Sequence, residues 1–211
     1  MSYTVKEIYF TIQGEGFHTG KDAVFCRFSG CNLWSGLEKD REKAICNFCD
    51  TDFVGTNGEG GGKFKTPQEL SESVFSFWAK RGQGKPYVVC TGGEPLLQLD
   101  VPLIEAFHNQ GLEVAIETNG TIEAPPGIDW ICVSPKADQE LKQTEGQELK
   151  LVYPQLLTPP EKFTDLHFDH FFLQPMDGPT LESNLAVTMQ YCLEHPEWRL
   201  SLQTHKYVGL K

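Results

Sequence analysis

The chain has 211 residues, 39% of them hydrophobic, and a formal net charge of −11 with a pI near 5.0. The length fits a single domain over residues 1–211, and the negative charge disfavours nucleic acid and anionic membranes as partners because both carry the same sign. No apolar run of about 18 residues predicts a membrane span, and residues 1–16 lack the pattern of a secretory signal, so we expect a cytoplasmic protein.

Strand-like and helix-like segments alternate along the chain. The expected strands are residues 23–29, 87–91, 113–117, 130–134, 149–153, 170–174 and 200–204. Residues 66–69, Thr-Pro-Gln-Glu, predict a helix start, with a capping threonine and proline at the first helical position. Leu70, Val74, Phe77 and Trp78 would form the apolar face of that helix.

Two more helices are expected further along the chain. Residues 103–107 show helical apolar spacing and precede Gly111, which suits a helix C-terminus. The third helix has its apolar residues at positions 181, 185, 189, 192 and 193 and ends before Pro196. Residues 55–65, with five glycines, are expected to form a loop, and the polar stretch 138–148 a loop or a short helix.

This order of elements favours an α/β fold with a parallel sheet and crossover helices. Six or seven strands with about three helices are too few for a complete eight-fold barrel. We therefore expect a partial, laterally open (β/α) barrel.

The cysteines are the most informative residues. Cys46 and Cys49 form a CxxC pair, and Cys31 precedes them across fourteen residues. Three thiolates can hold a [4Fe–4S] cluster and leave the fourth iron open to a ligand. The other four cysteines, Cys26, Cys90, Cys132 and Cys192, lie in apolar segments and are expected in the core.

The usual spacing for such a cluster is CxxxCxxC, so the chain carries an insertion around residues 34–45. The insertion raises the alternative of a structural zinc site. Zinc sites usually contain two close pairs of ligands, whereas this chain has no second CxxC and no histidine between Cys31 and Cys49. The cluster is therefore favoured over zinc.

Polar residues follow several of the expected strands. They include the Gly-Gly-Glu-Pro turn at residues 92–95, Glu117, residues 134–136 and residues 174–177. In a β/α barrel these strand ends form the mouth of the active site. Gln13 and Glu15, flanked by glycines, could join them to bind the ring nitrogens of a polar heterocycle, with Arg27 binding a carboxylate.

Taken together, these motifs resemble the 7-carboxy-7-deazaguanine synthase family of the radical S-adenosylmethionine (SAM) superfamily. The matching segments are residues 12–16, 27–33, 46–51, 91–95, 117–120, 134–136, 174–177 and 204–206. The resemblance implies a homodimer with a radical SAM barrel that contracts the ring of 6-carboxy-5,6,7,8-tetrahydropterin to 7-carboxy-7-deazaguanine, releasing ammonia. It also implies that SAM is regenerated, that the product enters queuosine and 7-deazapurine biosynthesis, and that a donor such as flavodoxin supplies electrons.

The resemblance also implies the roles of individual residues. Cys31, Cys46 and Cys49 would hold the cluster, and Thr51 would bind Mg²⁺, with Asp50 joining through a water. The SAM pocket would contain Gly93, Ser134, Pro135, Lys136, Gln174, Pro175, Met176 and Asp177. The pterin would contact Ile12, Gln13, Gly14, Glu15, Arg27, Thr91, Glu117 and His205. No catalytic acid or base is expected, because the cofactor carries the radical chemistry.

Two alternative functions stay open. One is an activating enzyme that installs a glycyl radical on a protein partner and consumes SAM. The other is a non-enzymatic zinc-binding protein that uses the same three cysteines. A separate hypothesis places the terminal carboxylate of the chain near the site.

Overall fold

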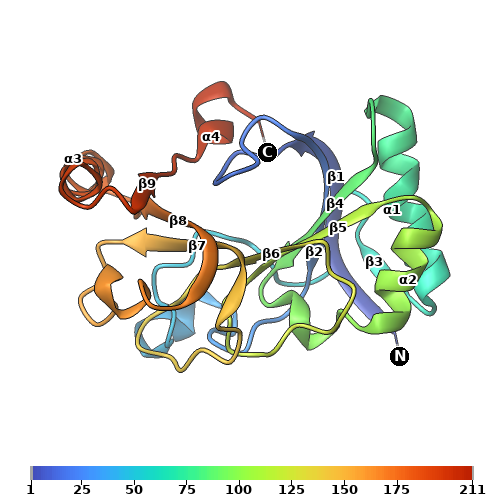
Figure 1. Cartoon of the computed structure of the whole chain (residues 1–211). Helices are drawn as coiled ribbons and strands as arrows, with labels where there is room; N and C mark the ends of the chain where they lie inside the picture. The colour runs from blue at the N-terminus through green and yellow to red at the C-terminus, as the bar shows by residue number, and fades with distance from the viewer. Residues whose placement is uncertain (1, 211) are drawn as a thin grey trace.

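The computed structural model describes residues 2–210, and its centre is one curved sheet of nine strands (Figure 1). The strands lie in the order β3-β1-β2-β4-β5-β6-β7-β8-β9. Their bounds are β1 Tyr3–Ile12, β2 Asp22–Phe28, β3 Gly62–Phe64, β4 Tyr87–Gly92, β5 Glu113–Thr118, β6 Trp130–Val133, β7 Glu145–Tyr153, β8 His167–Pro175 and β9 Trp198–Leu200. The two end strands of this order, β3 and β9, are not neighbours. The expectation of a partial, laterally open barrel is confirmed.

The sheet is parallel from β2 to β9, and β1 pairs antiparallel with both β2 and β3. Neighbouring parallel strands end at the same edge, so the residues that follow them are brought together. This edge is where the sequence predicted the polar site.

Three helices pack on the outside of the sheet and a short fourth one lies near its open side (Figure 1). They are α1 Pro67–Arg81, α2 Val101–Asn109, α3 Leu181–Glu194 and α4 Thr204–Val208, with 3₁₀ turns η1 Glu38–Lys43, η2 Pro95–Leu97 and η3 Pro160–Lys162. The hydroxyl of Thr66 accepts a hydrogen bond from the backbone N–H of Glu69, 3.1 Å away, as the capping pattern predicted.

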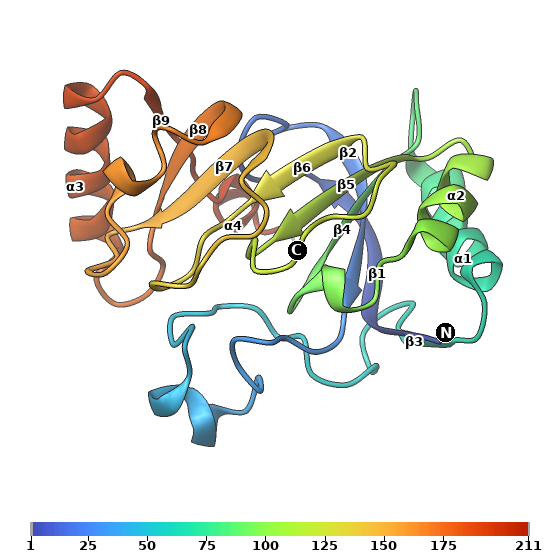
Figure 2. The same cartoon turned by 60° about the horizontal axis from the view of Figure 1, so that its bottom comes forward.

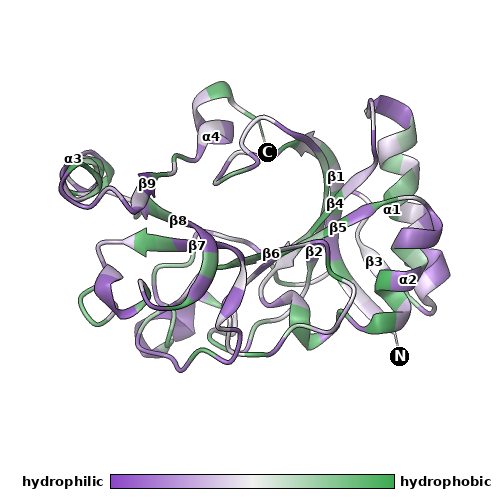
Figure 3. Ribbon diagram, in the orientation of Figure 1, coloured by the Kyte–Doolittle hydropathy of each residue, from purple (hydrophilic) through white to green (hydrophobic). Residues whose placement is uncertain are grey.

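The core has two parts. The larger one lies between α1, α2 and the strands β1, β2, β4 and β5, where Leu70, Val74 and Trp78 are buried. The smaller one surrounds Trp198 beneath α3. Figure 3 shows hydrophobic colour on the strands and on parts of the helices that pack against them. Cys26, Cys90 and Cys132 are buried as predicted.

Helix α3 exists where predicted, but its buried side is different. Asn184 and Thr188 are buried, whereas Met189 and Leu193 are exposed and Cys192 is only half-buried. The amide of Asn184 donates to the carbonyl of Met176, and the Thr188 hydroxyl donates to the carbonyl of Asn184. These bonds satisfy the polar groups, so small polar side chains can face the sheet in place of larger apolar ones.

Four other expectations were wrong. Strand β7 begins at Glu145, inside the stretch 138–148 that was expected to be a loop or a short helix. Strand β1 was not expected, because it carries charged residues at buried positions. The ammonium of Lys6 is hydrogen-bonded to the Asp52 carboxylate, and Glu7 forms an ion pair with Arg27. The short strand β3 lies within the expected loop 55–65. The last strand, expected at 200–204, ends at Leu200, and Thr204 begins α4 instead.

The segment between β2 and β3 contains the predicted insertion. It extends away from the sheet with η1 at its far end (Figure 2), and no η1 residue is buried. Within residues 2–210, no helix has the length and apolar character needed to cross a membrane.

Candidate active site

A cavity of about 530 Å³ opens at the carboxyl ends of the parallel strands. It is lined by nearly all the residues that the sequence predicted for the site. They are Ile12, Gln13, Gly14, Glu15, Arg27, Cys31, Cys46, Cys49, Thr51, Thr91, Gly93, Glu117, Ser134, Lys136, Gln174, Pro175, Met176, Asp177 and His205. Pro135 is the exception: it does not line the cavity, and its carbonyl accepts a hydrogen bond from the amide of Gln155.

The three predicted cluster ligands share one wall of this cavity. Cys31 follows β2, and its sulfur accepts a hydrogen bond from the backbone N–H of Leu33 at 3.4 Å. A hydrogen bond between the Cys46 and Cys49 thiols lowers the pKa of Cys49 to about 6 and raises that of Cys46, while burial raises the pKa of Cys31. Iron binds cysteine as thiolate, so these three side chains are of the type that holds an iron–sulfur cluster.

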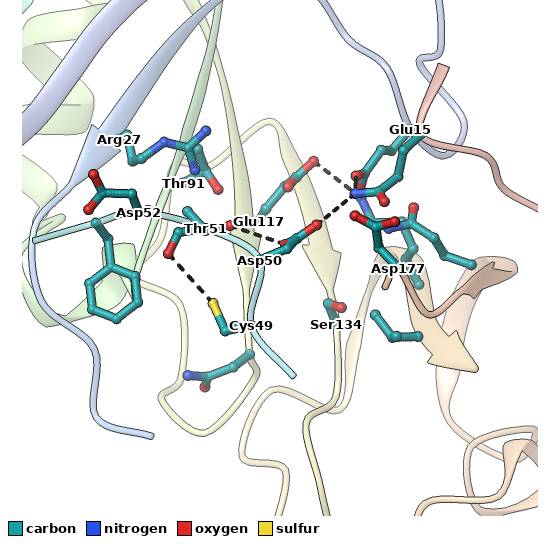
Figure 4. A pocket seen from close by; sticks show the side chains of 18 of the residues that line it. Glu15, Arg27, Cys49, Asp50, Thr51, Asp52, Thr91, Glu117, Ser134 and Asp177 are labelled. Atoms are coloured by element: carbon teal, nitrogen blue, oxygen red, sulfur yellow. Dashed lines mark hydrogen bonds and ion pairs between the residues drawn. The ribbon is translucent and has the colours of Figure 1, made fainter. Parts of the chain in front are cut away.

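The thiols are not gathered into a finished metal site. Within residues 2–210 there is no group of three or more histidine, cysteine, aspartate or glutamate side chains arranged to hold a metal ion. Thr51 lies near the cysteines, 3.5 Å from the Asp50 carboxylate through its hydroxyl (Figure 4). Thr51 and Asp50 supply oxygens of the kind that Mg²⁺ prefers.

The Gly-Gly-Glu-Pro turn after β4 is shaped by its neighbours in the chain. A Cβ atom on Gly93 would lie 2.0 Å from the carbonyl oxygen of Gly30, so only glycine fits there. Glu94 is fully buried, and its carboxylate accepts hydrogen bonds from Leu96, Thr118 and Asn119. Glu94 therefore ties the end of β4 to the end of β5 and does not reach the cavity.

A chain of polar contacts forms the wall opposite the cysteines. Lys150 on β7 lies between two predicted substrate ligands, 2.6 Å from Glu15 and 3.3 Å from Glu117. The amide of Gln13 donates to the same Glu117 oxygen at 3.0 Å. Burial alone would raise the pKa of Glu15, but the charge and hydrogen bonds of Lys150, with a hydrogen bond from Gln203, lower it. Glu15 is therefore kept ionised.

Arg27 faces the cavity beside Thr91 (Figure 4). Its Nε is 3.0 Å from the Glu7 carboxylate, and its Nη2 donates to the hydroxyl of Tyr9 at 2.9 Å. The guanidinium is thus held in one orientation with donors to spare for a ligand. Across the site, the Lys136 ammonium is hydrogen-bonded to the hydroxyl of Ser134.

The segment from β9 to α4 completes the cavity beside the loop that follows β1. The carbonyl of Gly14 accepts hydrogen bonds from both the backbone N–H and the hydroxyl of Thr204, each 2.9 Å long. The backbone of Gly14 also packs against the His205 ring, since a Cβ there would lie 2.1 Å from Nδ1. Lys206 bridges Asp50 at 2.8 Å and Asp177 at 2.5 Å.

Several cavity residues were not anticipated from the sequence, chiefly Glu7, Tyr9, Lys150, Gln203 and Lys206. Lys150 offered a signal: it is a lysine between Leu149 and Leu151 in a strand that is otherwise apolar at its centre. The hypothesis about the terminal carboxylate concerns Lys211, which lies outside the described residues.

Known proteins resemble this chain over its full length. The chain is 62% identical to the 7-carboxy-7-deazaguanine synthase of Caulobacter vibrioides and 59% identical to that of Bordetella pertussis, covering all of each protein. The crystal structure of QueE from Escherichia coli superposes with a TM-score of 0.71 at 26% identity, over 97% of this chain and 95% of that one. No family model matches the sequence.

Proposed function

Because this chain belongs to the 7-carboxy-7-deazaguanine synthase family, we propose that it contracts the ring of 6-carboxy-5,6,7,8-tetrahydropterin to 7-carboxy-7-deazaguanine with release of ammonia. The main support is that the chain is 62% identical to a named synthase over its full length and that the predicted ligands line one cavity. The reaction would serve the synthesis of queuosine and related 7-deazapurines.

The proposed cofactors are a [4Fe–4S] cluster held by Cys31, Cys46 and Cys49, SAM, and Mg²⁺ at Thr51. When bound, the cluster and SAM supply a carbon radical that removes hydrogen from the substrate and later returns it. The support for the cluster is chemical: three thiols line one cavity, and cysteine thiolates are the side chains that hold iron–sulfur clusters. Support for Mg²⁺ comes from the hydroxyl and carboxylate oxygens of Thr51 and Asp50.

The chain's own residues would bind and orient the pterin. Glu15 and Glu117 are acceptors for its ring N–H groups, and Gln13 is already hydrogen-bonded to Glu117. Arg27, fixed by Glu7, would bind the substrate carboxylate with its remaining donors. Such fixed contacts hold the reacting carbon in place, and a substrate enclosed by them is shielded from water.

The test is turnover by anaerobically reconstituted protein supplied with SAM, Mg²⁺, a reductant and the pterin, with product detected by mass spectrometry. We expect 7-carboxy-7-deazaguanine in molar excess over the SAM consumed, and none from Cys49→Ser. SAM cleavage without product would favour the glycyl-radical activating enzyme. A zinc-loaded, iron-free protein without activity would favour the zinc-binding alternative.

The proposal extends to assembly and surroundings. A homodimer is supported by the exposed apolar side chains of Met189 and Leu193 on α3, which a second copy would cover. Sedimentation of the wild type and of Leu193→Glu would test this.

The one-electron chemistry requires a donor such as flavodoxin. All seven cysteines are free, which supports a reducing compartment such as the cytoplasm, and the continuous sheet supports a single domain.

A further inference from the structure

Lys150 occupies an unusual place for a lysine. It lies in the centre of β7, its side chain is 4% exposed, and it lines the cavity. Its ammonium contacts Oε2 of Glu15 at 2.6 Å and Oε1 of Glu117 at 3.3 Å. Glu15 belongs to the loop after β1 and Glu117 to the end of β5, so this one group joins two distant parts of the cavity wall.

The arrangement depends on charge. A buried ammonium is costly unless it is paired, and two buried carboxylates side by side repel each other. Burial would lower the pKa of Lys150, but Glu117 and Glu15 outweigh it and raise the pKa well above its ordinary value. The other titratable groups around this trio are Glu148 on β7, Cys132 on β6, Tyr9 on β1, Tyr87 on β4 and Asp50 in the segment between β2 and β3.

The pterin needs acceptors at this wall. Its edge carries an amino group next to a ring N–H, both of which donate hydrogen bonds. A carboxylate accepts such bonds only while it is ionised, because the protonated acid presents a donor of its own. Carboxylates therefore bind this edge well only if something holds them oriented toward it and, where they are deeply buried, keeps them ionised.

We propose that Lys150 is the positioning residue of the pterin site: its ammonium holds Glu15 ionised and orients both Glu15 and Glu117 to accept hydrogen bonds from the heterocycle. This inference rests on the proposed function. Lys150 itself need not touch the substrate, since it acts through the two carboxylates.

The test is pterin binding, measured by calorimetry in the presence of SAM from pH 6 to pH 9 under anaerobic conditions. The wild type should bind with nearly constant affinity. Lys150→Met should bind about tenfold or more weakly at pH 6 and recover toward pH 9, because the buried Glu15 carboxylate takes up a proton once Lys150 is gone. Lys150→Arg should restore binding at low pH. Lys142→Met, which removes an exposed lysine, should behave like the wild type.

Folding is controlled separately. If Lys150→Met does not fold, the double variant Glu15→Gln/Lys150→Met has the same net charge as the wild-type trio. It should bind the pterin about tenfold more weakly than Glu15→Gln alone, because Glu117 has still lost its support.

Three outcomes would overturn the role of Lys150: unchanged affinity in a folded Lys150→Met, a loss equal at every pH, or equal binding by the double variant and Glu15→Gln. The first and third would show that the carboxylates need no lysine, and the second that the lysine does not act by keeping a carboxylate ionised. In each case the wild type would still bind. A wild type that binds no pterin at any pH would instead overturn the proposed function, and the role of Lys150 with it.

Discussion

Replacing Glu94 should destabilise the fold strongly, although the family resemblance assigned its neighbour Gly93 to the SAM pocket. Its fully buried carboxylate accepts three hydrogen bonds, from the N–H groups of Leu96 and Asn119 at 3.0 and 2.8 Å and from the Thr118 hydroxyl at 2.8 Å. Glu94→Ala would leave all three donors without this acceptor. At about 1 kcal/mol or more for each donor, the free energy of unfolding should fall by about 3 kcal/mol.

The assay is thermal and urea unfolding of the cluster-free protein. For a chain of this length, a loss of about 3 kcal/mol corresponds to a fall in Tm of roughly 6–12 °C. Glu94→Gln keeps the shape and should lose roughly half as much, since its amide nitrogen must face a donor. Glu123→Gln, at an exposed position, is the control. An unfolding free energy of Glu94→Ala within about 0.5 kcal/mol of the wild type would refute the reasoning.

Three further predictions concern other parts of the molecule. Gly93→Ala forces a Cβ onto a backbone carbonyl and should lower both Tm and the iron bound on reconstitution, whereas Gly62→Ala, whose nearest neighbour would be 3.8 Å away, should change neither. Burial raises the pKa of Asp129, but hydrogen bonds from a backbone N–H and from His108 outweigh it and lower the pKa below the ordinary value of 3.8. The stabilisation from the ionised carboxylate is therefore present above pH 3.8 and is lost as pH falls through the lower pKa of the folded state. In urea unfolding, Asp129→Asn should be less stable than the wild type by about 1 kcal/mol at pH 7, and this difference should disappear well below pH 3.8. Arg27→Lys removes the planar guanidinium that can donate two parallel hydrogen bonds to a carboxylate, and it should raise the KM for the pterin about tenfold in a steady-state assay. An unchanged KM would exclude a contact between residue 27 and the substrate carboxylate.

Local sequence patterns predicted the parts of the fold that depend on neighbours in the chain. The cap at Thr66 and the apolar spacing of α1 are examples, because a helix start is decided within a few residues. That the three cysteines and the polar residues after the strands line one cavity was also predictable, since cysteine spacing and polar residues after apolar strands are visible in the sequence. The family resemblance supplied the roles proposed for those residues.

The remainder depended on contacts between distant segments. Strand β1 was missed because Lys6 and Glu7 read as surface charges, whereas Asp52 and Arg27 pair with them inside the fold. Lys150 was missed for the same reason. A buried charge becomes intelligible only when its partner is known, and local pattern does not identify a partner far along the chain.

The join between the loop after β1 and the segment before α4 has a consequence for biosynthesis. Gly14 is held by Thr204, Gly16 by Ser201 and Glu15 by Gln203, pairs that lie 185 to 190 residues apart. A ribosome makes the first partner of each pair long before the second. The sheet can begin to form during translation, but this side of the cavity can close only after almost the whole chain has left the ribosome. The finished pocket therefore exists only once translation is nearly complete, and a chain that stopped before residue 201 would lack all three of these contacts.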